Sequence, residues 1–238
     1  RLFLKSGHTP TLFAAFFYLM FSFVIWVMNG AMAPYISEQF QLTAAQKGLL
    51  LSIPIVAGAV MRFPLGLLAQ YVGRKTATLV ELALITLTMS FGYFFVHTYD
   101  DLLKMALLLG VAGASFGVAM SLGSGWYPPK YKGLAMGLVG AGNAGTALAA
   151  LLAPPLAEAY GWQSVYGFAA LASFVPMAVV IFMAKEPPDR DVHAGMREHL
   201  ACLLEGDGWV FSLIYVVTFG GFIGIVTFLP TYYYDQFG

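Results

Sequence analysis

The chain has 238 residues, of which 59% are hydrophobic and only 10% are charged, and its formal net charge is zero. An average soluble domain has about 25% charged residues, so this composition excludes a water-solvated surface and indicates a chain embedded in lipid. The zero net charge also gives no reason to expect a nucleic acid or another polyanion as a partner.

Seven apolar runs follow one another along the chain, and each is long enough to cross a bilayer as a helix, which takes about 20 residues. We expect them at Thr11–Ile36, Leu49–Tyr71, Thr76–Val96, Leu102–Trp126, Gly133–Tyr160, Gln163–Ala184 and Trp209–Tyr233. The runs are continuous and do not alternate between polar and apolar residues, which favours helices over a barrel. The predicted fold class is therefore an all-α polytopic membrane bundle.

The basic residues between the runs predict the orientation. If the N-terminus is cytoplasmic, nine of the 12 lysines and arginines lie in cytoplasmic segments: Arg1, Lys5, Arg74, Lys75, Lys130, Lys132, Lys185, Arg190 and Arg197. Only Lys47 and Lys104 then lie outside, and Arg62 lies within a span. This distribution obeys the positive-inside rule, so we expect a multi-pass protein of the cytoplasmic membrane with its N-terminus inside.

The order of the runs predicts three parts. Residues 1–184 hold six spans, residues 185–208 are predicted as a central cytoplasmic loop, and residues 209–238 hold the seventh span. Six spans, a long loop and a further span follow the plan of transporters built from two six-helix halves. Because the chain starts at Arg1 rather than at a methionine, we expect a fragment whose complete site requires a missing C-terminal half.

Arg62 is the most informative residue, because a buried arginine in a span costs about 2.5–3.5 kcal/mol unless a partner or a wet cavity compensates it. At a rise of 1.5 Å per residue it lies about 20 Å from Leu49, in a hydrocarbon core about 30 Å thick. The alternative is that its side chain extends to the cytoplasmic face, about 14 Å away. No acidic residue shares its depth, so Arg62 indicates an anion as ligand.

Small residues crowd the fourth and fifth runs, where they let helix backbones touch. They are Gly110, Gly113, Gly117, Gly133, Gly137, Gly140, Gly142 and Gly145. Packing does not explain Asn143, an amide about 15 Å along the fifth run. We expect the flanking glycines to expose this amide and the nearby backbone to a ligand.

Three aromatic residues are selected by their depth. Phe116 lies about 15 Å from the cytoplasmic end of the fourth run. Phe219 lies about 15 Å along the seventh run, and Tyr215 about 9 Å along it. Four of these residues converge near one level on four different helices: Arg62, Phe116, Asn143 and Phe219. The middle of the membrane is where transporters of this kind place their substrate.

The segment between the second and third runs, Gly66-Leu-Leu-Ala-Gln-Tyr-Val-Gly73-Arg74-Lys75, resembles the loop signature of the major facilitator superfamily, Gly-x-x-x-Asp-Arg-x-Gly-Arg-Arg/Lys. Four positions match: Gly66, Gly73, Arg74 and Lys75. The resemblance implies a gating loop at these positions. Gln70 and Tyr71 replace the Asp-Arg pair, so the charge relay of that pair is not expected, and an ordinary basic loop is the alternative.

Three stretches resemble the nitrate/nitrite porter family: Arg62 to Gly66, Gly113 through Trp126-Tyr-Pro-Pro129 to Gly145, and Tyr215 to Gly224. The resemblance implies a secondary active transporter of nitrate or nitrite, or both, that works by alternating access without a cofactor. It implies that the anion is bound by Arg62, Asn143, Gly140 and Gly142 and is enclosed by Phe116, Tyr215 and Phe219. It further implies a second arginine in an eighth span, which this chain lacks.

The chemistry of nitrate suits these residues. Nitrate is planar and singly charged, and the planar fork of arginine matches two of its oxygens. An amide adds a directional donor. Aromatic walls would hold a flat ion and exclude bulky ones.

Three other functions stay open: a transporter of another small anion such as a carboxylate or sulfonate, a non-transporting anion sensor or scaffold, and an intramembrane enzyme. The enzyme is disfavoured because His8, His97, His193 and His199 form no catalytic or metal set, and we expect no metal. Cys202 is the only cysteine, so no disulfide forms within the chain.

The coupling mode stays open between exchange of nitrate for nitrite and proton symport. A proton-coupled carrier keeps an ionisable carboxylate or histidine in its spans, and Glu81 is the one candidate in the inner part of these runs. Glu81 lies near the cytoplasmic end of the third run, on a helix expected at the lipid side. We therefore predict that this half contains no proton site, and that any proton route uses the absent half or the substrate arginines.

Overall fold

The computed structural model describes residues 2–188, 201 and 204–237, and within these ranges it holds helices and connecting turns but no strand. The helices are α1 (Leu2–Lys5), α2 (Thr9–Trp26), α3 (Met28–Phe40), α4 (Ala44–Val72), α5 (Arg74–Phe94), α6 (Tyr99–Gly113), α7 (Ser115–Ser124), α8 (Pro129–Gly140), η1 (Ala141–Ala144), α9 (Gly145–Tyr160), α10 (Trp162–Ala172), α11 (Phe174–Met183), α13 (Gly206–Tyr215), η3 (Val216–Gly220) and α14 (Gly221–Phe237).

Within the described ranges, seven continuous rods are long and apolar enough to cross a membrane. They run over Thr9–Phe40, Ala44–Val72, Arg74–Phe94, Tyr99–Ser124, Pro129–Tyr160, Trp162–Met183 and Gly206–Phe237. The predicted all-α bundle is thus confirmed, but several rods begin earlier than their apolar runs. Polar caps extend them: Thr43 and Gln46 form a capping box at the start of α4, and Thr98 and Asp101 form one at the start of α6.

Several rods are irregular near their middle. Val27 interrupts the first between α2 and α3, and Ala114 interrupts the fourth between α6 and α7. The fifth contains the 3₁₀ turn η1, and the seventh contains the π-helical segment η3. Such departures from α-helical geometry inside a helix are frequent at functional sites.

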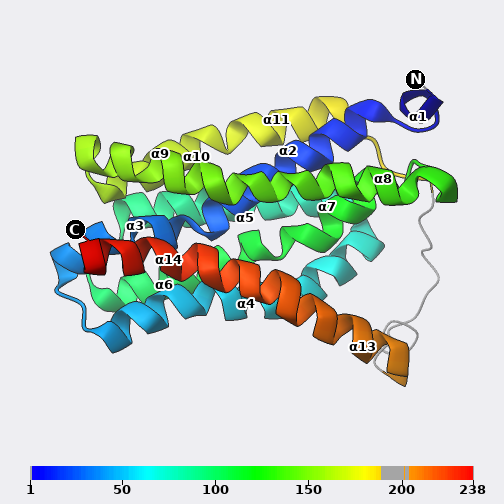
Figure 1. Cartoon of the computed structure of the whole chain (residues 1–238). Coiled ribbons are helices and arrows are strands. Elements are labelled where there is room, and N and C mark those ends of the chain that lie inside the picture. Colours follow the sequence, from blue (N-terminus) through cyan, green and yellow to red (C-terminus); the bar gives the residue numbers. More distant parts are fainter. Residues whose placement is uncertain (1, 189–200, 202–203, 238) are drawn as a thin grey trace.

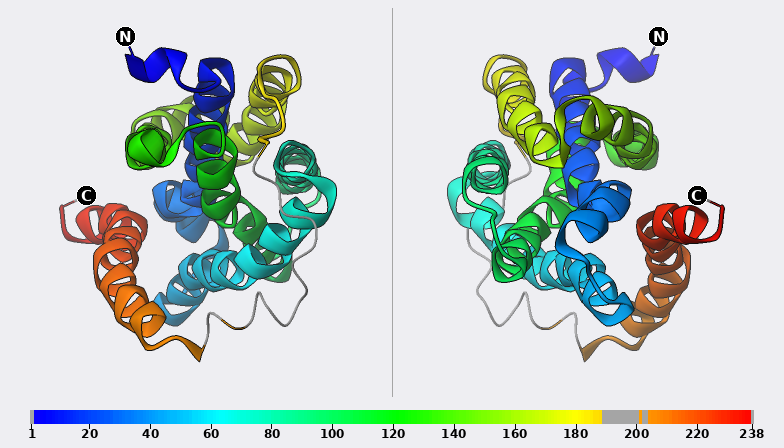
Figure 2. Two further views of the ribbon diagram at one scale, coloured as in Figure 1. Left: turned by 90° about the vertical axis from the view of Figure 1, so that its right-hand side faces the viewer. Right: turned by 90° about the vertical axis from the view of Figure 1, so that its left-hand side faces the viewer.

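The bundle has two distinct ends (Figure 1). We call the end with Arg74, Lys75 and Lys185 the basic end; the N-terminus lies there, and the C-terminus lies at the opposite end. Helix α2 runs through the interior and packs against α7, α9 and α11. Viewed along the rods, α13 and α14 lie at the margin of the bundle (Figure 2).

The seventh span contacts the rest mainly at the opposite end. There α14 packs on α3, so closely that a Cβ atom at Gly30 would come within 2.7 Å of the carbonyl oxygen of Thr227. Lys47 also forms an ion pair of 3.0 Å with Asp235. At the basic end, in contrast, α13 has no buried residue. Among the described helices, the seventh span is therefore packed against the bundle at the opposite end and stands away from it at the basic end.

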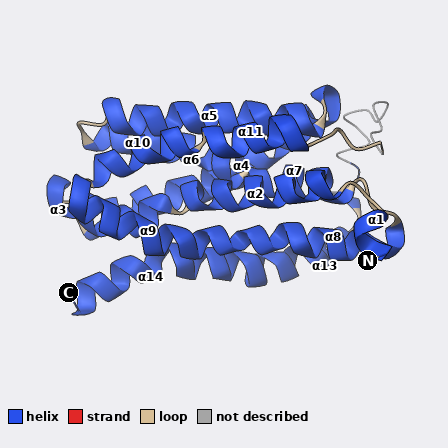
Figure 3. Ribbon diagram, turned by 90° about the horizontal axis from the view of Figure 1, so that it is seen from above, coloured by secondary structure: helices blue, strands red, loops and turns tan. Residues whose placement is uncertain are grey.

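Helix α5 lies at the edge of the bundle but carries Glu81 on its inner side. This helix lies along one edge of the bundle in Figure 3, and it exposes Val80, Leu84 and Leu87 on one side, as expected of a lipid-facing helix. Glu81, however, lies on its inner side and is 0% exposed. The helix thus lies at the edge of the bundle as expected, but one turn of a helix presents residues to both lipid and protein, and Glu81 faces the protein.

Candidate functional site

Arg62 lies among four aromatic rings, which we call the ring cage: Trp26, Phe116, Tyr215 and Phe219. The Cζ atom of Arg62 is 5.3 Å from the ring centre of Phe219, 5.8 Å from those of Phe116 and Tyr215, and 5.9 Å from that of Trp26. Cations within about 6 Å of a ring are attracted to its face. The rings come from the first, fourth and seventh spans, so tertiary folding brings them to one guanidinium.

Two hydrogen bonds orient the guanidinium. Its Nε donates to the carbonyl oxygen of Gly113 at 3.3 Å, and its Nη1 donates to the hydroxyl of Tyr215 at 3.1 Å. Gly113 is the last residue of α6, where carbonyl groups lack partners within the helix. Arg62 forms no ion pair within the part of the chain that the structure describes. Since a guanidinium has five N–H donors, others remain for an anion.

The rings of the cage also support one another. Tyr215 and Phe219 are stacked with ring centres 4.9 Å apart, and Phe219 lies at 19° to the plane of Trp26. Phe116 packs against both members of the stacked pair. Such contacts hold flat walls in place around Arg62.

Trp26 is a member of the cage that the sequence analysis missed. Its Nε1–H donates to the carbonyl oxygen of Pro54 at 2.9 Å, and its ring fills the space beside Gly113, where a Cβ atom would come within 2.3 Å of it. Phe23 packs edge-on against it. Both lie near the centre of the first apolar run, so the depth criterion used for Phe116 would have selected them.

Asn143 lies in the 3₁₀ turn η1, which packs against α2. The glycines around it allow this approach: a Cβ atom at Gly142 would come within 3.0 Å of the backbone nitrogen of Met20, and one at Gly145 within 2.0 Å of its carbonyl oxygen. Gly140 lies beside the Met120 side chain. Glycine is therefore needed at positions 142 and 145 for backbone packing.

The amide of Asn143 is incompletely bonded. Its Oδ1 is buried and has no hydrogen-bond partner among the described residues. The structure brings Arg62, Phe116, Tyr215 and Phe219 together. No hydrogen bond in the described ranges joins Asn143 to Arg62, and the turn that carries Asn143 packs against α2. A buried polar atom without a partner costs about 1–3 kcal/mol. An amide oxygen is an acceptor and cannot bond to an anion, so only the Nδ2–H donors of Asn143 can bind one.

A cavity of about 400 Å³ leads from the basic end toward the ring cage. Its lining consists of Arg74, Phe116, Gly117, Met120, Ser121, Ser124, Lys132 and Met136. Phe116 is shared with the cage, while Arg74 and Lys132 supply positive charge. A cleft lined by one sign of charge raises the local concentration of ions of the other sign.

The loop with Gly73, Arg74 and Lys75 is held by Glu186. The carboxylate of Glu186 accepts the backbone N–H of Arg74 at 2.8 Å and that of Lys75 at 2.9 Å, at the N-terminus of α5. A helix N-terminus favours such a negative charge. Gly73 has a φ of 98°, which glycine adopts without strain, whereas nothing lies within 4 Å of a Cβ atom at Gly66.

The side chains of this loop reach two other spans. The Nη1 atom of Arg74 donates to the carbonyl oxygen of Ser121 at 3.3 Å, and Nζ of Lys75 donates to that of Ile181 at 2.8 Å. Glu186 was missed by the sequence analysis, although it is the first acidic residue after the sixth run. It places a carboxylate at the loop, where the superfamily signature has an aspartate that this chain lacks.

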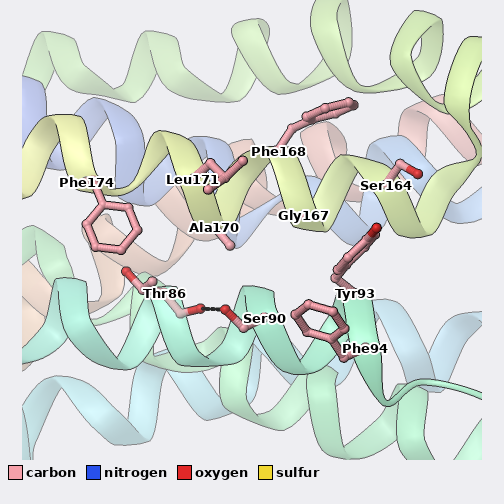
Figure 4. Close-up of a pocket in the computed structure, with 10 residues that line it drawn as sticks. All are labelled: Thr86, Ser90, Tyr93, Phe94, Ser164, Gly167, Phe168, Ala170, Leu171 and Phe174. Carbon is pink, nitrogen blue, oxygen red and sulfur yellow. Dashed lines mark hydrogen bonds between the residues drawn. The ribbon is translucent and has the colours of Figure 1, made fainter.

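A second cavity, of about 330 Å³, lies between α5 and the rod of α10 and α11 (Figure 4). It is lined by Thr86, Ser90, Tyr93, Phe94, Ser164, Gly167, Phe168, Ala170, Leu171 and Phe174. These side chains are apolar or neutral, so they offer an anion no compensating charge.

Several predicted features fall outside the described residues. They include His193, His199, Cys202 and most of the predicted loop over residues 185–208. His8, in contrast, is a described residue. It caps α2, because its Nδ1 accepts the backbone N–H of Thr11 at 3.2 Å. In the described ranges, no group of three His, Cys, Asp or Glu residues is placed to hold a metal.

Comparisons with known proteins show the family of the chain. A family model of the Major Facilitator Superfamily matches residues 12–238. The chain is 29% identical over 230 residues to the nitrite extrusion protein of Bacillus subtilis (strain 168), covering 92% of this chain and 55% of that protein. It is 31% identical over 233 residues to the probable nitrate/nitrite antiporter NarK1 of Thermus thermophilus, covering 91% and 52%. The chain thus spans about half the length of the curated relatives it matches.

A solved structure shares the fold. A bacterial homologue of the human lysosomal transporter Spinster, in an inward-facing and unoccupied conformation, superimposes with a TM-score of 0.69 at 20% identity. The match covers 95% of this chain and 55% of that one.

Proposed function

The chain belongs to the Major Facilitator Superfamily, a family of transporters rather than enzymes, and we propose that it acts in secondary active transport of nitrate, nitrite or both. The observation that carries this proposal is Arg62 inside the ring cage, with N–H donors left for a ligand and no carboxylate paired to it among the described residues. A planar anion can accept two parallel hydrogen bonds from a guanidinium and stack between flat rings. The names of the relatives from Bacillus and Thermus support nitrate and nitrite over other small anions.

We assign the roles within this proposal as follows. Arg62 binds the anion, and Phe116, Tyr215, Phe219 and Trp26 enclose it. Asn143 turns its amide toward the anion from the glycine-lined turn that includes Gly140 and Gly142. A second arginine, on a span beyond the seventh, completes the site.

We further propose that the protein lies in the cytoplasmic membrane with its N-terminus and basic end inside. The positive-inside rule supports this orientation. The ion pair between Lys47 and Asp235 then closes the outer end, and the cavity lined by Arg74 and Lys132 opens inward. Gly66, Gly73, Arg74 and Lys75 form the gating loop, which Glu186 holds against the sixth span in this state. The similar Spinster homologue was also captured facing inward.

The test is uptake of labelled nitrate by the complete protein in liposomes. Internal nitrite would drive exchange, and an imposed pH gradient would drive proton symport, so the two arms separate the coupling modes. Unlabelled carboxylates and sulfonates serve as competitors. Stronger competition by these anions than by nitrite would assign a different substrate, and nitrate binding without uptake would indicate a sensor rather than a transporter.

A further inference from the structure

Glu81 and Tyr18 form a buried polar pair away from the ring cage. Both side chains are 0% exposed, and the hydroxyl of Tyr18 on α2 donates to Oε2 of Glu81 on α5. The second carboxyl oxygen, Oε1, is buried and has no hydrogen-bond partner among the described residues. The carboxyl group is thus buried between two spans, and only one of its two oxygens has a hydrogen-bond partner.

Among the described residues, no positive charge compensates this carboxyl group. Glu81 takes part in no ion pair within the described ranges. Helices α7 and α11, which pack on α5, carry no titratable residue, and α10 carries only Tyr166, whose hydroxyl donates to Asn29.

The remaining charged groups are occupied elsewhere or lie at helix ends. On α4, Arg62 is in the ring cage, Lys47 pairs with Asp235, and Tyr71 is in the last turn. The titratable residues of α6 lie in its first two turns: Tyr99, Asp100, Asp101 and Lys104. On α5 itself, Arg74 and Lys75 donate to main-chain carbonyls and lie about 9–10 Å before Glu81 by helical rise, and Tyr93 lies in its last turn.

An ionised carboxylate in such a place would be strongly destabilising, because a buried charge without a partner is usually neutralised by a proton. Burial also removes the reason for which the sequence analysis excluded a proton site in these spans. Resting on the proposed transport function, we propose that Glu81 is a proton-binding site, protonated while it is sealed against Tyr18. On release, the O–H bond of the acid breaks, the proton passes to water, and the carboxylate remains.

Helix α2 connects this site to the anion site. Tyr18 lies about 12 Å along α2 from Trp26, which belongs to the ring cage, and Met20 between them touches the backbone of Gly142 and Gly145. A charge on Glu81 favours separation of α2 from α5, because water must then reach the carboxylate. Movement of α2 changes the positions of Trp26 and of the turn that holds Asn143. Proton occupancy at Glu81 is therefore linked to anion binding through one helix.

Infrared spectroscopy of the complete protein in liposomes tests protonation directly. We expect a carboxylic acid carbonyl band at neutral pH that is lost in Glu81→Gln. The matched control is Glu158→Gln, because Glu158 also accepts a hydrogen bond from a tyrosine, Tyr35, but at an exposed position, so its replacement leaves the band unchanged. Tyr18→Phe is expected to shift the frequency of the band, which assigns it to Glu81 even if Glu81→Gln folds poorly.

Transport by the same variants tests coupling. We expect Glu81→Gln to lose nitrate accumulation driven by a pH gradient and to keep exchange of nitrate for nitrite. The proposal is overturned if the band persists in Glu81→Gln, if the wild type accumulates no nitrate on a pH gradient, or if Glu81→Gln accumulates it as the wild type does. If the wild type fails both in exchange of nitrate for nitrite and in uptake driven by a pH gradient, the proposed nitrate transport itself is refuted. The infrared measurement does not depend on transport and still tests protonation of Glu81.

Discussion

The Nη1 atom of Arg62 lies 3.1 Å from the hydroxyl oxygen of Tyr215, although 153 positions separate the two residues along the chain. This hydrogen bond joins the second span to the seventh, directly before the π-helical segment that carries Phe219. The seventh span has few other contacts at the basic end. In the proposed alternating-access cycle, Arg62 therefore contacts both the anion and the seventh span, so a movement of that span changes the position of the guanidinium that binds the anion.

Replacing Arg62 by lysine is expected to abolish nitrate transport while the protein still folds and inserts. Lysine keeps the positive charge but loses the planar fork that binds two oxygens at once. Uptake of labelled nitrate in liposomes measures the effect, and size-exclusion chromatography in detergent checks the fold. Near-normal uptake by Arg62→Lys would show that bidentate binding is not required.

Replacing Tyr215 by phenylalanine is expected to weaken nitrate binding several-fold, because one hydrogen bond that orients Arg62 is worth about 0.5–1.5 kcal/mol. The stacked ring is kept, so the cage is preserved. The matched control is Tyr232→Phe, at an exposed tyrosine of the same span. Equal affinities of Tyr215→Phe and wild type in a binding titration would contradict an orienting role.

Asn143→Ala is expected to weaken nitrate binding about tenfold, as for the loss of one hydrogen bond to a charged group. Gln163→Ala is the control, since this amide donates to the carbonyl oxygen of Val96 far from the ring cage. Isothermal titration of both variants with nitrate measures the difference. If Asn143→Ala binds nitrate like the control, Asn143 has only a packing role in its turn.

Glu186→Gln is expected to loosen the proposed gating loop. An amide side chain has one acceptor oxygen, so one of the two backbone N–H groups of Arg74 and Lys75 loses its partner, and the negative charge at the start of α5 is lost. Hydrogen exchange at these two backbone amides should become faster than in the wild type. Glu158→Gln serves as the control. If hydrogen exchange at these two amides is unchanged in Glu186→Gln, Glu186 does not hold the loop in place.

Asp235→Asn is expected to open the end of the bundle opposite the basic end by a small amount, since exposed ion pairs contribute about 0.2–1 kcal/mol. A cysteine at Ser37, which lines the same surface cavity as Lys47 and Asp235, reports the opening when Cys202 is replaced by serine. Its reaction with an impermeant thiol reagent should become up to a few-fold faster. Exchanging the two charges, with Lys47→Asp and Asp235→Lys, should restore the slow reaction; if the double variant reacts as fast as Asp235→Asn, the pair does not hold this end closed.

Much of the site was already predictable from the sequence. Arg62, Phe116, Tyr215 and Phe219 were selected because depth along a helix follows from a fixed rise per residue. All four meet in the structure. Trp26 has a similar depth but was not separated from the many other aromatic residues of the chain, and its contact with Gly113 depends on which helices are neighbours.

The amino-acid sequence alone determined that seven apolar helices cross a bilayer and that an arginine lies inside the second with no acidic residue at its depth. Both conclusions follow from the cost of exposing polar groups to hydrocarbon, which depends on composition and length. Only the tertiary structure decided which side of α5 carries Glu81 and which carboxylate, Glu186, reaches the proposed gating loop. These features depend on the rotation and packing of each helix, which are set by neighbours far away in the chain.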